Sequence, residues 1–124
     1  VEFGQGTLQL DEEKKRIVIR IEERGAFPSG SADLAPAFAD VARRIGESLA
    51  DIPGEIAIEG HTDDLPISTA RFRSNWDLSA ARASSVANAL LATGTVAPGR
   101  LRVHGFAETR PRVENTSAAL RAQN

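Results

Sequence analysis

Three short segments in which apolar and polar residues alternate are separated by two longer segments with helical periodicity. The alternating segments are residues 16–22, 55–59 and 101–105. A period of two predicts strands that are apolar on one face and largely solvated on the other. The order strand, helix, strand, helix, strand predicts right-handed crossovers that join parallel strands.

Each of the two intervening segments has the period of an amphipathic helix. In the first, apolar residues recur every three or four positions: Leu34, Phe38, Val41, Ile45 and Leu49. The second helix is expected from about Asn75 to Thr93, with Gly94 ending it. Both helices can therefore cover the apolar side of the strands.

The one-sided strands decide between two architectures. A doubly wound sheet, covered on both faces, has strands that are apolar almost throughout, whereas here only alternate residues are apolar. We therefore predict an α/β (α+β) two-layer sandwich of βαβαβ order, with both main helices on one face. Residues 7–10 are expected to add a small antiparallel strand beside 16–22, which makes the predicted sheet mixed.

Composition excludes several classes of protein. The 124 residues, of which 41% are hydrophobic, fit one domain with a single core. A formal charge of −2 gives no overall basic field for nucleic acid. The absence of cysteine excludes disulfides and thiolate zinc sites, and no apolar run reaches the length of a transmembrane helix. Because the first residue is Val1 rather than methionine, we expect an excised fragment.

An arginine lies on the apolar face of the second helix. At about 100° per residue, Arg82 shares a side with Leu78, Val86 and Leu90, and Asn75 projects from that side too. A buried guanidinium is costly unless fixed acceptors surround it. Arg82 is close enough to the helix start to reach back toward backbone N–H groups that favour an anion.

Asp63 follows the predicted strand 55–59, at the edge of the sheet where open α/β proteins bind ligands. A carboxylate and the guanidinium of the second helix are thus expected at one rim. The residue pattern is equally compatible with an internal salt bridge between them. Asp63 or Asp64 could also cap a local turn, His61 could be a core histidine, and Trp76 is interpreted as a packing residue at the helix entrance.

Four stretches carry a resemblance to a known family. They are IEGHTDDLPI, FRSNWDLSAARASSVANALL, RLRVHGFAETRP and NTSAALRAQN, in this order along the chain. Together they resemble the OmpA-like peptidoglycan-binding domain, and most of all the periplasmic domain of MotB-type flagellar stator subunits. The resemblance implies an OmpA-C-like domain over residues 27–124, with residues 1–26 forming strands that lead into it. Because the family pattern continues past Asn124, its final strand is expected to be missing.

The resemblance also implies a ligand and a set of site residues. Asp63, from the GHTD motif, would accept the ammonium group of a diaminopimelate residue in the peptidoglycan stem peptide. Arg82, from the LSxxR motif, would hold a carboxylate of the same residue. Asn75 would add a neutral hydrogen bond, Arg121 a second cation, and Thr62 a further contact.

The function implied is a non-catalytic anchor without cofactor or metal that holds a flagellar stator to the cell wall. It would be periplasmic, part of an inner-membrane-anchored protein, homodimeric, and joined to a membrane-embedded stator partner through segments outside this chain. No nucleic-acid partner is expected. Two other functions stay open at this point. One is an OmpA- or Pal-type envelope anchor outside the motor.

The other is a metal-dependent hydrolase whose ligands would come from His61, Asp63, Asp64 and His104. Against a hydrolase, the chain has only two histidines and no HExxH spacing.

Overall fold

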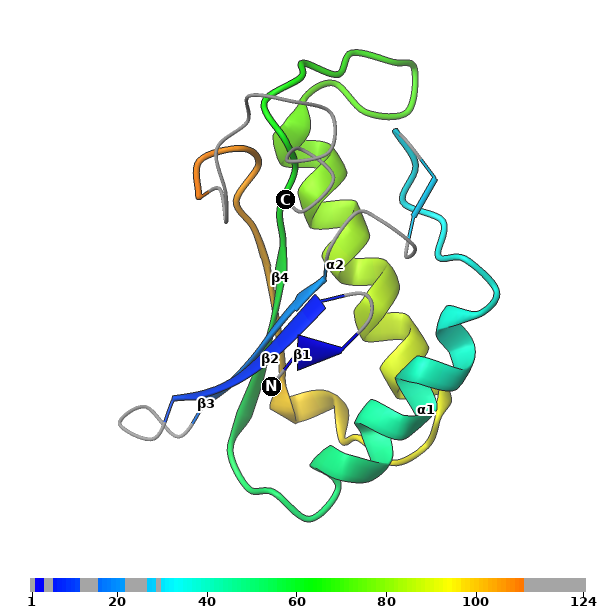
Figure 1. Ribbon diagram of the computed structural model, residues 1–124, viewed down its shortest axis with the longest axis vertical. Coiled ribbons are helices and arrows are strands. Elements are labelled where there is room, and N and C mark those ends of the chain that lie inside the picture. The colour runs from blue at the N-terminus through cyan, green and yellow to red at the C-terminus, as the bar shows by residue number, and fades with distance from the viewer. Residues whose placement is uncertain (1, 4–5, 12–15, 22–26, 29, 111–124) are drawn as a thin grey trace.

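The computed structural model describes residues 2–3, 6–11, 16–21, 27–28 and 30–110. Figure 1 shows the order of the elements, which are β1 (Glu2–Phe3), β2 (Gly6–Asp11), β3 (Arg16–Ile21), α1 (Phe38–Leu49), β4 (Glu55–Gly60), α2 (Asn75–Ala92), the 3₁₀ helix η1 (Pro98–Arg100) and β5 (Leu101–Gly105). The predicted α/β class and βαβαβ order are therefore confirmed. None of the helices in this part of the chain has the length and apolarity needed to cross a bilayer.

The strands form one sheet in the order β1-β2-β3-β4-β5. Within the βαβαβ unit, β3, β4 and β5 pair only in parallel, so the prediction of a mixed sheet is wrong for this unit. A helix between successive strands returns the chain to the same end of the sheet. Antiparallel pairing is confined to β1 with β2 and β2 with β3, where the predicted small strand at 7–10 is found.

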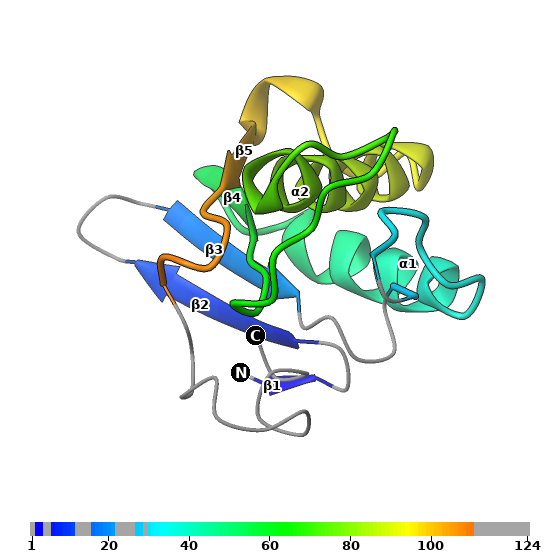
Figure 2. The same cartoon turned by 90° about the horizontal axis from the view of Figure 1, so that it is seen from above.

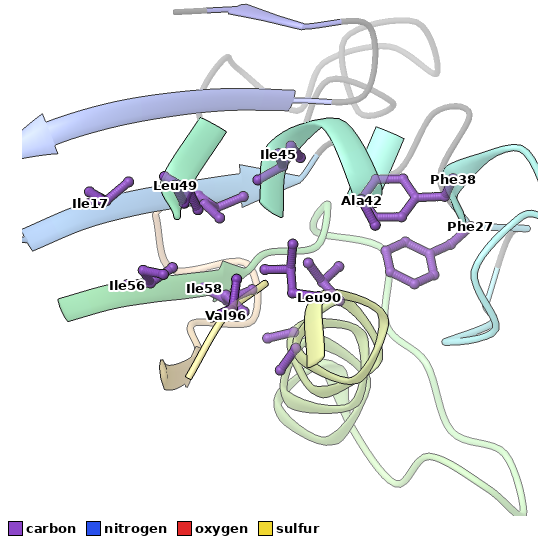
Figure 3. Close-up of a cluster of buried hydrophobic side chains, with 14 residues drawn as sticks. Ile17, Phe27, Phe38, Ala42, Ile45, Leu49, Ile56, Ile58, Leu90 and Val96 are labelled. Atoms are coloured by element: carbon purple, nitrogen blue, oxygen red, sulfur yellow. The ribbon is translucent and has the colours of Figure 1, made fainter. Parts of the chain in front are cut away.

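Both helices lie on one face of the sheet, as Figure 2 shows. The residues of β3 and β4 that face them are at most 1% exposed: Ile17, Ile19, Ile56 and Ile58. Figure 3 shows Ile17, Ile56 and Ile58 beside the apolar residues of α1 and α2, with Phe27 and Phe38 at one end of the core. The alternation in the strands thus predicted the buried face correctly.

Helix α1 begins at Phe38, four residues after the start of the predicted apolar pattern at Leu34. The residue before a proline is disfavoured in the helical region, so Ala35 cannot continue a helix into Pro36. The chain instead makes a turn in which the Phe38 N–H donates to the Ala35 carbonyl at 2.9 Å. Leu34 still packs against the core from outside the helix.

Helix α2 lies unusually close to the ends of β4 and β5. A Cβ atom on Gly60 would stand 1.9 Å from the carbonyl oxygen of Ser79, and one on Gly105 would stand 2.8 Å from the nitrogen of Ala80. Only glycine fits at such an approach of two backbones. These contacts fix the position of α2 along the sheet, and with it the position of every side chain in the first turns of the helix.

Candidate functional site

A cavity of about 230 Å³ lies beyond the carboxyl end of β4, beside the first turns of α2. It is lined by Gly30, Thr62, Asp63, Leu65, Pro66, Ile67, Asn75, Leu78 and Arg82. Four residues singled out in the sequence, Thr62, Asp63, Asn75 and Arg82, therefore share one cavity. The fifth, Arg121, lies outside the described residues.

The guanidinium of Arg82 is held by backbone carbonyls. The residue is 3% exposed, its Nε donates to the carbonyl of Ser31 at 2.8 Å, and one terminal nitrogen donates to the carbonyl of Pro28 at 3.5 Å. Its Cζ also lies 5.1 Å from the centroid of the Phe27 ring. Carbonyl dipoles and an aromatic face offset the cost of burying the cation.

Asp63 and Arg82 form no ion pair with each other among the residues that the structure describes. The internal salt bridge left open by the sequence is therefore wrong. Asp63 Oδ1 instead accepts from the N–H of Leu65 at 3.0 Å, which confirms the local turn as the role of this oxygen. A carboxylate has about four acceptor positions, so this bond leaves capacity for a donor in the cavity.

Asn75 joins two loops. Its Nδ2 donates to the carbonyl of Leu65 at 3.1 Å and to Glu108 Oε2 at 3.2 Å, with the carbonyl of Asp63 at 3.5 Å. An amide nitrogen has two hydrogens, so the protein itself uses the donors that were expected to meet a ligand. Glu108 was not predicted as a site residue, although its place just after β5 matches that of Asp63 after β4.

Thr62 is also committed to the protein. Its N–H donates to the carbonyl of Ala107 at 2.9 Å, and its Oγ1 donates to the carbonyl of Asp63 at 2.9 Å. Ala107 has a positive φ of 52°, and its N–H donates to Ser79 Oγ at 3.0 Å. The backbone after β4 is thus tied to the backbone after β5 and, through Ser79, to helix α2.

A further pair of loops meets at the cavity. Arg71 donates from its two terminal nitrogens to the two carboxylate oxygens of Asp33, each at 3.2 Å. This hydrogen bond holds the pKa of Asp33 below its ordinary value. Phe72, the next residue after Arg71, is buried in a small hydrophobic cluster with Ala32 and Leu78. The loop that carries Asp63 is thereby held against the loop whose carbonyls hold the arginine of the cavity.

Helix α2 begins where the sequence predicted, at Asn75. Ser74 is its N-cap, with the side chain accepting from the N–H of Asp77 at 3.5 Å, while Asp77 accepts from the N–H of Arg73 at 3.0 Å. This reciprocal pairing satisfies two N–H groups at the helix start. Trp76 is 52% exposed, so the predicted packing role at the helix entrance is wrong.

The two histidines do not build a metal centre. His61 is 3% exposed and its Nε2 lies 3.0 Å from Glu59 Oε1, which confirms the core histidine. Both His61 and His104 stack on the ring of Phe106. Across the described ranges, no three His, Cys, Asp or Glu side chains gather in a way that could hold a metal ion, so the hydrolase alternative has no ligand set.

Comparisons with known proteins agree on one family. The sequence profile of the OmpA family matches residues 26–124. Motility protein B of Escherichia coli K12 is 39% identical over 104 residues, which are 82% of this chain and 34% of that protein. The chain thus spans about a third of the length of this curated relative.

Two solved structures are similar over most of the chain. The cell wall anchor of the T6SS from Pseudomonas aeruginosa has a TM-score of 0.75 and 39% identity, with coverage of 84% of this chain and 72% of that one. The periplasmic domain of Helicobacter pylori MotB, residues 97–256 in its own numbering, has a TM-score of 0.77 and 25% identity, with coverage of 100% and 80%.

Proposed function

The chain belongs to the OmpA family of peptidoglycan-binding domains, and on that premise we propose that its cavity binds the diaminopimelate residue of a peptidoglycan stem peptide. The family binds the cell wall and is not enzymatic. The observation that carries the proposal is that Asp63 and Arg82 line one cavity of about 230 Å³ without pairing with each other. The lining of this cavity therefore carries one charge of each sign, as recognition of a zwitterionic ligand requires.

The free end of diaminopimelate is a zwitterion with an ammonium and a carboxylate on one carbon. Asp63 would accept the ammonium, and Arg82 would donate to the carboxylate through its planar fork. The apolar wall of the cavity, made by Pro66, Ile67 and Leu78, suits the methylene chain of the ligand. Charge recognition at one end and apolar contact along the chain are the usual division in a small-molecule site.

The remaining predicted residues take different parts in this proposal. Asn75 and Thr62 would hold the loop of Asp63 in place, because their donors already bond to protein atoms. The Oδ1 of Asn75 is the atom left to meet a donor of the ligand. Arg121, outside the described residues, is proposed to close the site with a second cation.

We test the site by co-sedimentation with purified sacculi. Asp63→Asn removes the charge while keeping the acceptor that bonds the Leu65 N–H, and should abolish sedimentation. Asp64→Asn makes the same change in charge at the exposed neighbouring position and should sediment like the wild type. Equal sedimentation of the two variants would overturn the assignment.

A ligand-side control avoids the folding risk of changing the buried Arg82. A stem peptide ending in lysine instead of diaminopimelate keeps the ammonium but lacks the carboxylate. It should bind at least tenfold more weakly, because a charge-assisted bidentate pair contributes roughly 1.5–3 kcal/mol. Equal affinity for both peptides would remove Arg82 from the proposed recognition.

At the level of the whole protein, we propose a flagellar stator subunit that this domain anchors to the cell wall. The similarity to motility protein B supports this role, and the similarity to the periplasmic domain of H. pylori MotB supports a periplasmic location. A homodimer and a membrane-embedded stator partner belong to the same proposal. Loss of swimming in soft agar on deletion of the gene, with normal flagellar filaments, is the expected result.

The similarity to the T6SS cell wall anchor favours a second candidate, an envelope anchor outside the motor. Both candidates use the same cavity and differ in the machine that is anchored. Unchanged swimming of the deletion strain would exclude the stator and leave the second candidate.

A further inference from the structure

A second, much smaller cavity lies on the inner side of Arg82. Its volume is about 10 Å³, and it is lined by Phe27, Glu59, Gly60, His61, Arg82, Ala83 and Val86. This volume is at the lower limit for one water molecule. Arg82 lines both the large cavity and the small one, so whatever fills the small cavity touches the cation of the ligand site.

His61 brings an unsatisfied polar atom to this place. Its side chain is 1% exposed, and within the described part of the chain its Nδ1 is buried without a hydrogen-bond partner. Its other nitrogen, Nε2, is 3.0 Å from Glu59 Oε1. Buried polar atoms are nearly always bonded to protein or to an ordered water, and the cavity beside His61 has room for such a water.

The hydrogen bond between His61 Nε2 and Glu59 determines whether His61 Nδ1 is a donor or an acceptor. Hydrogen bonding from His61 is the largest cause that lowers the pKa of Glu59 below its ordinary value, so the carboxylate is ionised at neutral pH and can only accept. Nε2 therefore carries the hydrogen, and in the neutral ring Nδ1 is left as an acceptor. A water that donates to Nδ1 directs its own oxygen lone pairs away from the ring.

We propose that one water molecule occupies the small cavity, donates to His61 Nδ1 and accepts from the guanidinium of Arg82. The line of contacts then runs from Glu59 through His61 and the water to Arg82. The carbonyls of Pro28 and Ser31 hold the guanidinium from the side of the loop, and the water holds it from the side of the sheet. His61 is thereby a positioning residue for Arg82, although it does not line the ligand cavity.

The water and the tautomer are tested on the wild-type domain. A crystal structure at 1.5 Å or better should show one ordered water within hydrogen-bond distance of both His61 Nδ1 and Arg82. Nitrogen-15 spectra, recorded at a pH where the ring is neutral, should show the hydrogen on Nε2 and an unprotonated Nδ1. An empty cavity, or the hydrogen on Nδ1 in the neutral ring, would overturn the inference.

Two nearly isosteric variants separate the positioning role from simple packing. His61→Asn places an oxygen near the position of Nδ1 and loses the bond to Glu59, whereas His61→Gln keeps a donor for Glu59 and loses the acceptor for the water. We expect His61→Asn to bind meso-diaminopimelate like the wild type, and His61→Gln to bind about tenfold more weakly. The reverse order of affinity would show that the Glu59 bond, not the water, positions the arginine.

The binding arm rests on the proposed function, whereas the crystallographic and NMR arms do not. A wild-type domain that fails to bind meso-diaminopimelate would refute the proposed function, and the water and the tautomer would still decide this inference. If a variant fails to fold, the same two measurements on the wild type decide it.

Discussion

Arg100 offers a quantitative test of the contacts that join the end of α1 and the loop before β4 to the residue that precedes β5. Its guanidinium donates to the carbonyl of Gly54 at 2.9 Å, to that of Leu49 at 3.0 Å, and also to that of Ile52. Leu49 is the last residue of α1, where a cation also interacts favourably with the helix dipole. Arg100→Lys keeps the charge but cannot reach all three acceptors with a single ammonium group.

Loss of two bonds from a charged donor, each contributing about 1–1.5 kcal/mol in a half-buried setting, gives a destabilisation of roughly 2–3 kcal/mol. The assay is urea denaturation followed by circular dichroism, in which the midpoint should fall with an unchanged m-value. Arg102→Lys is the matched control, because Arg102 is exposed and exposed ion pairs contribute at most about 1 kcal/mol. Equal destabilisation of both variants would refute the reasoning, and so would a loss below about 0.5 kcal/mol for Arg100→Lys.

Binding should be unaffected by Arg100→Lys. Figure 1 shows η1, which ends in Arg100, near the carboxyl end of α2, whereas the ligand cavity lies at the amino end of that helix. Sacculus binding by the folded variant should therefore match the wild type. This separation of stability from binding distinguishes the variant from changes at Asp63.

Gly60→Ala should destabilise the domain by at least about 1–3 kcal/mol, because the new Cβ would stand 1.9 Å from a backbone oxygen of α2. Gly99→Ala is the control, because a Cβ there would have nothing within 4 Å. Its free energy of unfolding, measured by the same denaturation assay, should stay within about 0.5 kcal/mol of the wild-type value. Ser74→Ala should cost about 1 kcal/mol through loss of the N-cap of α2, with Ser84→Ala on the exposed side of the same helix as the control. The pKa of Glu59 is lowered from its ordinary 4.5, so its ionised form stabilises the fold above that pH and the stabilisation is lost as pH falls through the lower folded value. The stability difference between wild type and Glu59→Gln should therefore shrink between pH 6 and pH 3, and a difference that grows would contradict the assignment.

The sequence predicted the elements where local pattern and tertiary packing agree. Ile17, Ile19, Ile56 and Ile58 alternate because one face of the sheet is buried, and that alternation reveals both the strands and the side on which the helices lie. Asp63 and Arg82 could be placed together because one follows a strand end and the other lies on a buried helical face. The strand end and the buried helical face both follow from the spacing of apolar residues, which can be read from the sequence alone.

What the sequence missed depends on the backbone. The acceptors of Arg82 are the carbonyls of Pro28 and Ser31, and a carbonyl is present at every residue, so no side chain marks the ones that will be used. For the same reason the pattern suggested Asp63 as the partner of the arginine. The role of Asn75 was hidden because its partner Glu108 comes from a segment 33 residues away.

The hydrogen bonds from Arg82 to backbone carbonyls have a consequence for the entropy change of ligand binding. A free arginine side chain on a surface loses up to about 2 kcal/mol of rotamer entropy when a ligand immobilises it. Arg82, at 3% exposure and bonded to two carbonyls, has already lost that freedom during folding. Under the proposed function, each arriving stem peptide would meet a guanidinium in the same orientation, so repeated detachment and reattachment would need no rearrangement of the cation.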